Sequence, residues 1–124
     1  MRNNYENLEV YKRSFFVSVQ ILKVIDDIRP YRLAEQLIAA AISIPSNIAE
    51  GSERNSEKEF LVFLGYSSGS TAELITQLKI IKEAERQVKL DLDFLISELI
   101  EINAMLRSLI INKRRRLNEF EKNK

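Results

Sequence analysis

The stretch that decides the fold is Ser43-Ile44-Pro45-Ser46-Asn47-Ile48-Ala49-Glu50-Gly51-Ser52, which places a proline inside helical spacing and then reaches a glycine. Apolar residues keep to one helical face through the proline: Leu37, Ala41, Ile44 and Ile48. A proline inside a helix removes one backbone donor and clashes with the preceding turn, at a cost of about 3 kcal/mol. The segment therefore predicts a proline-bent helix that is packed on both sides.

The rest of the chain is also helical in pattern. It contains only three glycines and two prolines, and strand-like alternation is missing nearly everywhere. Periodicity and end signals predict helices over about 7–28, 33–50, 56–86 and 91–116, with residues 117–124 as a tail. Helices joined by such short turns favour an all-α, antiparallel up-down-up-down four-helix bundle, in a single domain over residues 1–124.

Two kinds of local signal stand out around the predicted third helix. Ser56 and Glu59 form a capping box at its start, while Gly51 is a good stop for the helix before it. Gly65 and Gly69 lie in a stretch of small residues and favour close approach of another helix. The alternative is a helix that is merely weakened, because each glycine costs about 1 kcal/mol against alanine.

The first and last predicted helices carry more apolar surface than one buried seam needs. The first has two stripes: Leu8, Tyr11, Phe15, Val19, Leu22, and Val10, Val17, Ile21, Val24, Ile28. The last has a heptad seam and further isoleucines beside it: Leu92, Leu95, Leu99, Ile102, Leu106, Leu109, and Ile96, Ile100, Ile110, Ile111. A monomer would expose a larger patch than soluble proteins usually tolerate, so we expect the bundle to associate with copies of itself.

The composition argues against an enzyme. Cysteine and histidine are absent, which excludes disulfides, thiolate metal sites and the commonest general base. Di-metal bundles need Glu-x-x-His pairs and are excluded on the same ground, although carboxylates alone could still bind a hard cation. We expect no catalytic residue, metal, cofactor or small-molecule substrate.

The chain shows no sign of a membrane or secretory protein. Residues 1–6 are polar with no apolar h-region after them, and the longest apolar run covers only residues 37–42. We therefore expect a cytoplasmic protein with no membrane partner.

A basic cluster is the second notable feature. Lys113, Arg114, Arg115 and Arg116, together with Arg107, form a stretch without acidic residues, although the whole chain carries a net charge of only +1. These cations could neutralise phosphates of RNA or DNA, complement a solvated helix end, or contact a membrane surface. Because no aromatic residue is interleaved, base stacking is not expected there.

Residues in the second and third predicted helices resemble those of a known family. The residues that carry the resemblance are the run 43–51, Arg54, Ser56, Glu59-Phe60, Gly69-Ser70, Glu73-Leu74 and Gln77-Leu78. They are similar to the bacterial four-helix-bundle family named after proteins encoded in intervening sequences of large-subunit ribosomal RNA genes. The resemblance implies a homo-oligomeric ring, typically a homopentamer, without catalytic activity. It also implies kinship with accessory proteins of diversity-generating retroelements, which bind a reverse transcriptase and nucleic acid through a basic surface.

The resemblance places Pro45, Ser46, Asn47, Glu50 and Gly51 in the family signature. Their side chains are either functional or structural. The structural interpretation is favoured, because small polar groups near a proline can satisfy the backbone carbonyl that it frees.

One departure from the family bears on function. Where the family usually has a basic pair between Gln36 and Pro45, this chain has Ile38 and Ala39. We therefore expect an oligomeric scaffold or adaptor for a protein partner, with a nucleic-acid-binding accessory protein as the alternative.

Overall fold

The structure is a computed structural model that describes residues 4–123. Its elements are the 3₁₀ turn η1 (Tyr5–Asn7), α1 (Glu9–Lys23), the 3₁₀ turn η2 (Ile25–Asp27), α2 (Tyr31–Ser52), α3 (Glu57–Glu83) and α4 (Leu92–Lys122). No strand occurs in residues 4–123. The prediction of an all-helical protein with four main helices is confirmed.

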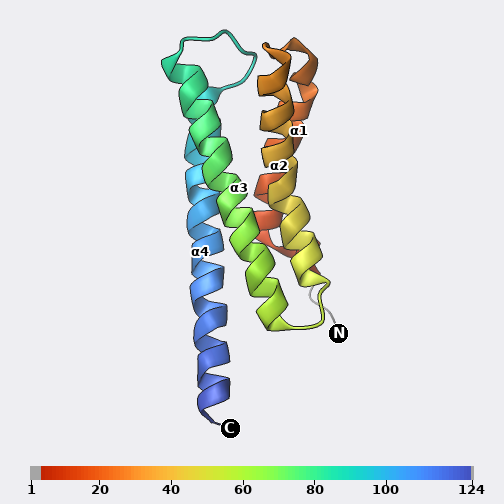
Figure 1. The fold of residues 1–124 in the computed structure, drawn as a ribbon, viewed down its shortest axis with the longest axis vertical. Helices are drawn as coiled ribbons and strands as arrows, with labels where there is room; N and C mark the ends of the chain where they lie inside the picture. Colours follow the sequence, from red (N-terminus) through yellow and green to blue (C-terminus); the bar gives the residue numbers. More distant parts are fainter. Residues whose placement is uncertain (1–3, 124) are drawn as a thin grey trace.

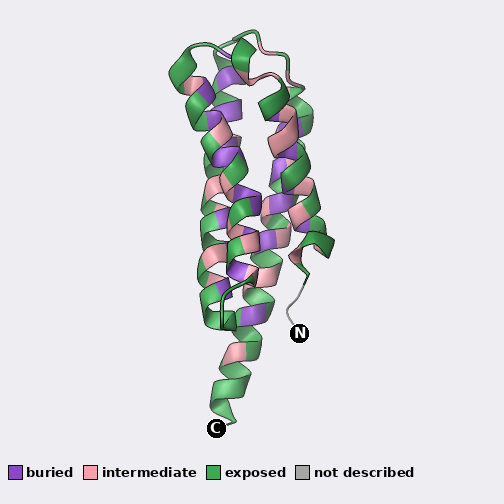
Figure 2. Cartoon of the chain, turned by 90° about the vertical axis from the view of Figure 1, so that its right-hand side faces the viewer, coloured by how far each residue is buried: buried purple, intermediate pink, exposed green. Residues whose placement is uncertain are grey.

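The helices lie side by side along one long axis. The α2–α3 turn is at one end and the α3–α4 loop at the other, with α1 behind α2 (Figure 1). Figure 2 shows buried residues along the inside of the helices and mostly exposed residues on the part of α4 that extends past the others. Each helix contributes one stripe to the core, represented by Val17, Ile21, Leu37, Ile44, Leu74, Leu78, Leu99 and Ile102, all 0% exposed.

Helix α2 continues through Pro45 because its neighbours support it. The missing donor of Pro45 leaves the buried Ala41 carbonyl without its helical partner. Ser18 Oγ on α1 donates to that carbonyl oxygen at 2.8 Å. On the other side, Ser67 Oγ on α3 donates to the Ile44 carbonyl oxygen, also at 2.8 Å. The bonds attach α1 and α3 to α2 at the level of the proline.

The expectation that Gly51 ends the second helix is wrong. Helix α2 runs to Ser52, and no glycine of the described residues has a positive φ. A Cβ at position 51 would lie 2.6 Å from Phe63 Cβ and 2.9 Å from Phe60 Cδ1. Glycine is needed here because α3 approaches closely.

The interpretation of Gly65 and Gly69 as a close helix contact does not hold within the protomer. A Cβ built on either residue would meet no atom within 4 Å. Both glycines are exposed, and α3 contacts α2 through Ser67 and Ser70 instead. The two glycines leave a flat outer surface on α3.

Two helices end earlier than predicted. The first, predicted over 7–28, ends at Lys23 in α1; Asp26 and Asp27 are unfavourable at a helix C-terminus, and η2 turns Ile28 into the core. The third ends at Glu83 rather than 86. The left-handed residue Glu85, with φ 56°, closes it in a Schellman motif.

Helix α4 is longer than the predicted 91–116. It continues to Lys122, so most of the expected tail is helical, while Lys124 lies outside the described residues. Nothing in residues 117–122 breaks a helix, and Lys58 Nζ on α3 lies 3.3 Å from Glu121 Oε1. The end of α4 therefore extends beyond the start of α3 (Figure 1).

Replacing Ser18 by alanine should destabilise the protein by about 1–3 kcal/mol, because the buried Ala41 carbonyl loses its donor. Ser108→Ala is the matched control, since Ser108 is an exposed helical serine on α4, and it should change stability by no more than about 0.5 kcal/mol. Urea unfolding followed by circular dichroism, at one protein concentration, measures both. Equal stability of the two variants would contradict the role of Ser18.

Candidate functional site

The signature residue Asn47 belongs to the contact between α2 and α3. Its Nδ2 donates to the Ser43 carbonyl oxygen at 2.8 Å and lies 2.9 Å from Ser43 Oγ. Ser43 Oγ is in turn 2.8 Å from Ser70 Oγ on α3. The three side chains form a polar chain between the helices, so the structure places Asn47 in a supporting position.

The other signature residues are distributed over different surroundings. Pro45 is buried, whereas Ser46 is exposed. Glu50 is exposed and forms an ion pair with Arg54 at 3.8 Å, one turn further along. Such surface pairs contribute about 0–1 kcal/mol. The signature is therefore not a single cluster of functional side chains.

An apolar groove runs along the outside of the α1–α2 pair. It has a volume of about 250 Å³ and is lined by Tyr11, Phe15, Ser18, Val19, Leu22, Ile42, Pro45, Ser46 and Ala49. Phe15 is 52% exposed, Leu22 55% and Ile42 45%. The lining from α1 is the first of the two predicted stripes, while the other stripe is largely buried.

The groove continues toward η2. Leu22 also lines a second hollow of about 600 Å³, together with Ile25, Asp26, Arg29, Tyr31, Ala34, Glu35 and Ile38. Here the lining becomes mixed, because charged side chains join the apolar ones. The long α1–α2 groove is therefore apolar in its middle and charged at this end.

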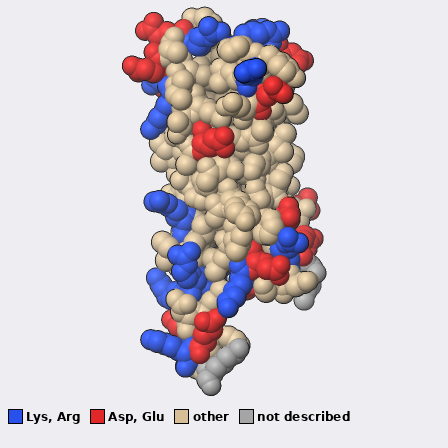
Figure 3. Space-filling model, viewed as in Figure 1, with Lys and Arg blue, Asp and Glu red and all other residues tan. Residues whose placement is uncertain are grey.

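The middle of the molecule carries almost no charge outside α4. Residues 14–22 of α1, 36–49 of α2 and 60–72 of α3 contain no acidic or basic side chain. Figure 3 shows a mostly uncharged middle on the face where α2 and α3 lie in front, with charges concentrated toward both ends. We call these three ranges the uncharged waist.

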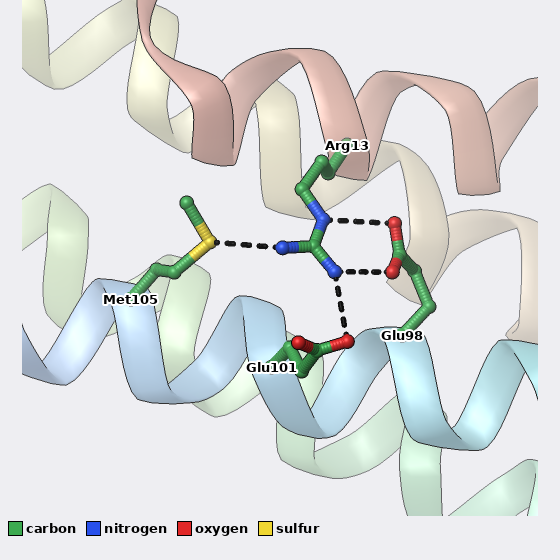
Figure 4. Close-up of polar contacts among 4 residues, drawn as sticks. All are labelled: Arg13, Glu98, Glu101 and Met105. Carbon is green, nitrogen blue, oxygen red and sulfur yellow. Dashed lines mark hydrogen bonds and ion pairs between the residues drawn. The ribbon is translucent and has the colours of Figure 1, made fainter.

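A charged cluster holds α1 to α4. Arg13 binds Glu98 through two hydrogen bonds, of which Nε to Oε2 measures 2.9 Å. Arg13 Nη2 also donates to Glu101 Oε2 at 3.0 Å, and Nη1 lies 3.5 Å from the sulfur of Met105 (Figure 4). The hydrogen bonds from Arg13 lower the pKa of Glu98, against the opposing effect of burial.

The arginines of the predicted basic cluster are available for binding. Arg107, Arg114, Arg115 and Arg116 are all exposed, and none forms an ion pair with any residue of the described range 4–123. Arg114 and Arg115 line an open hollow along the end of α4, which they share with Ile111, Asn118, Glu119, Glu121 and Lys122.

Lys113 does not belong to this free basic surface, although the sequence groups it with the arginines. Lys113 is only 8% exposed, and its Nζ donates to Glu57 Oε2 at 2.8 Å. The same ammonium lies 4.7 Å from the centre of the Phe60 ring. Position 113 continues the apolar seam of α4, which turns this lysine inward toward α3.

The sequence interpretation missed the Arg13 cluster and the role of Ser18. Arg13 and Ser18 are polar residues that interrupt the apolar stripes of the first helix, and this interruption was the signal in the sequence that each has a polar partner. Neither could be assigned a partner, because Glu98 is 85 residues from Arg13 and Ala41 is 23 residues from Ser18.

Two further observations concern metal-binding groups and membrane-spanning helices. Among residues 4–123, no group of three or more acidic side chains, histidines or cysteines could hold a metal ion. No helix within that range has the length and apolar character needed to cross a bilayer.

Comparisons with known proteins identify similar chains. The family described as 23S rRNA-intervening sequence protein matches residues 6–108. The fold is similar to that of a protein of unknown function from the S23 ribosomal protein family of Bacteroides thetaiotaomicron, with a TM-score of 0.74 and 21% identity over 82% of this chain and 97% of that one. At this identity the likeness shows the fold alone. No curated protein matches the chain.

The Arg13–Glu98 pair should make stability depend on acid. The folded-state pKa of Glu98 lies below its ordinary value of 4.5, so the pair stabilises fully above that pH and loses its contribution as pH falls through the folded pKa. At pH 7, Glu98→Gln should lower the free energy of unfolding by about 1.5 kcal/mol, the lower value for hydrogen bonds to charged groups.

The deficit of Glu98→Gln should shrink between pH 5 and pH 3, as measured by urea unfolding. Glu101→Gln is the control, because Glu101 is 62% exposed and makes one bond to Arg13; it should have a smaller effect. A deficit of the Glu98 variant that stays constant over this pH range would contradict the assignment.

Proposed function

The chain belongs to the 23S rRNA-intervening sequence protein family, and we propose that it is a non-enzymatic, self-assembling helical-bundle protein that acts as a scaffold or adaptor for a protein partner. The family match covers residues 6–108, which agrees with the resemblance read from the signature around Pro45.

The observation that carries the proposal is the exposed apolar stripe of α1. Phe15 and Leu22 are each more than half exposed, although the helix already buries a full stripe through Val17 and Ile21. Burying a leucine or phenylalanine side chain contributes about 1.5–3 kcal/mol. A groove of this kind favours contact with another apolar surface, and a further copy of the chain is the most available partner.

The proposed assembly is a ring of antiparallel bundles, each bent at Pro45, with five subunits as the family resemblance implies. The residues that replace the family's basic pair support an apolar contact. Ile38 lines the continuation of the groove, and Ala39 lies in the uncharged waist. Neither adds a charge that would oppose burial.

A binding role fits the side chains better than catalysis does. The chain has no histidine or cysteine, and the charged groups that come together, such as Arg13 and Glu98, are bound to each other. Because the chain offers no disulfides, a reducing compartment suits it, and we propose the cytoplasm as its place of action.

The full chain should sediment and scatter light as a species whose mass is a multiple of the 14.4 kDa protomer, five-fold if the family ring forms. Because the contact is apolar, the assembly should persist at high salt, where interactions between exposed charges are screened. Analytical ultracentrifugation in low and high salt measures both. A stable monomer at micromolar concentration, or dissociation by salt alone, would refute self-assembly through the apolar stripe.

A second function is favoured by one observation: the exposed arginines at the end of α4. Arg107, Arg114, Arg115 and Arg116 make no ion pair with residues 4–123, so they can neutralise phosphates. Assembly would repeat this patch on every subunit, which raises avidity without new contacts. Glu119 lines the same hollow and weakens its positive field, so this function ranks second.

Changing Arg114, Arg115 and Arg116 together to alanine should weaken binding to RNA or duplex DNA and reduce the salt slope by about one for each lost phosphate contact. Lys113→Met is the matched control, because Lys113 is occupied by Glu57, and it should leave the slope unchanged. Fluorescence anisotropy over a salt series provides the measurement. If wild-type protein does not bind at low salt, or the triple variant binds like wild type, the nucleic-acid function is excluded.

A further inference from the structure

Two uncharged faces of the protomer are exposed at the same height along the bundle. One is the apolar groove between α1 and α2, lined by Phe15, Ile42 and Ser46. The other is the outward side of α3, where the exposed Val62 and Tyr66 stand beside the flat surface at Gly65 and Gly69. We call the second surface the α3 ridge. The groove is concave. The α3 ridge is the convex side of a single helix and includes two glycines, so another surface can approach it closely.

Hydrogen bonds between the helices establish the common height. Ser18 on α1 bonds to Ala41 on α2, and Ser43 on α2 bonds to Ser70 on α3. These side chains therefore lie near one cross-section of the bundle. The groove residues adjoin Ser18 and Ser43, and Gly69 adjoins Ser70, so the middle of each face lies close to this cross-section.

Helix α4 does not offer a comparable face. Its exposed side carries Glu101 and Arg107 close to the same region, while the waist ranges of α1, α2 and α3 carry no charge. Packing the groove against α4 would remove from water Arg107, which has no ion-pair partner among residues 4–123, and the exposed part of Glu101, which is costly. The α3 ridge can be covered without that cost over residues 62–69, and the exposed Glu73 begins one turn beyond Gly69.

Beyond the two faces, one pair of charges is complementary. Glu35 lines the charged end of the groove, and it is about 12 Å along α2 from Ser43 at 1.5 Å per residue. Lys79 is exposed on α3, about 13.5 Å from Ser70 in the same direction along the bundle. Neither forms an ion pair with a residue of the described range. If neighbouring protomers stand at equal height, Glu35 of one and Lys79 of the next lie at the same level, and their opposite charges attract each other.

We propose that the α1–α2 groove of one protomer receives the α3 ridge of the next copy of the chain. This rests on the self-assembly proposed above and specifies its geometry. The contact is head-to-tail, since different faces of the two copies meet. Because both faces lie at one height, neighbours are related by rotation with no shift along the bundle axis. Without an axial shift the contact does not extend as a helical filament, and it closes into a ring where the rotation between neighbours divides a full turn.

Blocking variants test the pairing. Ile42→Lys places a charge in the groove and Tyr66→Lys places one on the ridge; both positions are exposed, at 45% and 56%, so the fold should be retained and is checked by circular dichroism. Each variant alone should be a monomer by ultracentrifugation. The control Ile100→Lys changes an isoleucine that is 51% exposed on α4, and it should keep the wild-type mass.

Mixing the two blocked variants gives the sharper test. The Tyr66→Lys chain keeps an intact groove and the Ile42→Lys chain keeps an intact ridge. One good contact remains per pair, so the mixture should form a two-chain species and nothing larger. If either blocked variant keeps the wild-type mass, or if the mixture stays monomeric, the proposed pairing is overturned.

Cross-linking gives an independent readout, because the chain has no cysteine of its own. Ser46 and Gly65 are exposed, with Ser46 in the groove and Gly65 on the ridge. A mixture of Ser46→Cys and Gly65→Cys should be joined by a short bismaleimide, while neither variant should be joined to itself. Efficient self-linking of Ser46→Cys would instead show groove packed on groove, and no linking in an intact assembly would place the contact elsewhere. Both results overturn the pairing alone, whereas a monomeric wild type overturns self-assembly as well.

Discussion

The structure depends on hydrogen bonds from α1 and α3 that allow α2 to remain helical through Pro45, which has no backbone donor. Pro45 leaves the carbonyl of Ala41 unpaired in the core, where an unsatisfied acceptor costs about 1–3 kcal/mol. Ser18 supplies the missing donor from α1, and Ser67 adds a bond to Ile44 from α3. A hydroxyl group can reach a neighbouring backbone only if the two helices lie close together. The same bonds that satisfy α2 therefore set its distance from α1 and α3, and they leave the outer edge of the α1–α2 pair as an apolar groove.

Features that depend on residues within one or two turns of each other could be predicted from the sequence. The capping box is an example, because the Glu59 amide donates to Ser56 Oγ at 3.2 Å. The apolar periodicity separated a buried stripe of α1, which includes Val17 and Ile21, from a second stripe that includes Phe15. Helical geometry alone determines which side chains share a face. It does not determine which face another subunit covers, so the surplus stripe predicted an interaction without identifying its occupant.

Features that depend on distant partners could not be predicted in the same way. Lys113 stands beside three arginines in the sequence, and the position of Phe60 and Glu57 on α3 shows that its charge is already neutralised. Its register on the seam of α4 was a usable signal, since it falls seven residues after Leu106. Arg13 gave no such signal for its partner Glu98 on α4. The sequence could thus identify a basic helix end, but the number of cations available there followed only from the packing of α3 against α4.

The end of α4 extends beyond its attachment to α3, so a rotation of α4 at this attachment displaces the end of the helix. Lys113 attaches α4 to the beginning of α3 through Glu57 and Phe60, and residues 114–122 continue for about 13 Å beyond that point. A small tilt of the helix at its attachment is magnified at the tip. Conversely, a load on residues 114–122 exerts a torque on the seam between α3 and α4, which the exposed Lys58–Glu121 ion pair opposes only weakly. The charged end of the chain and its core are therefore mechanically connected through a single rigid rod.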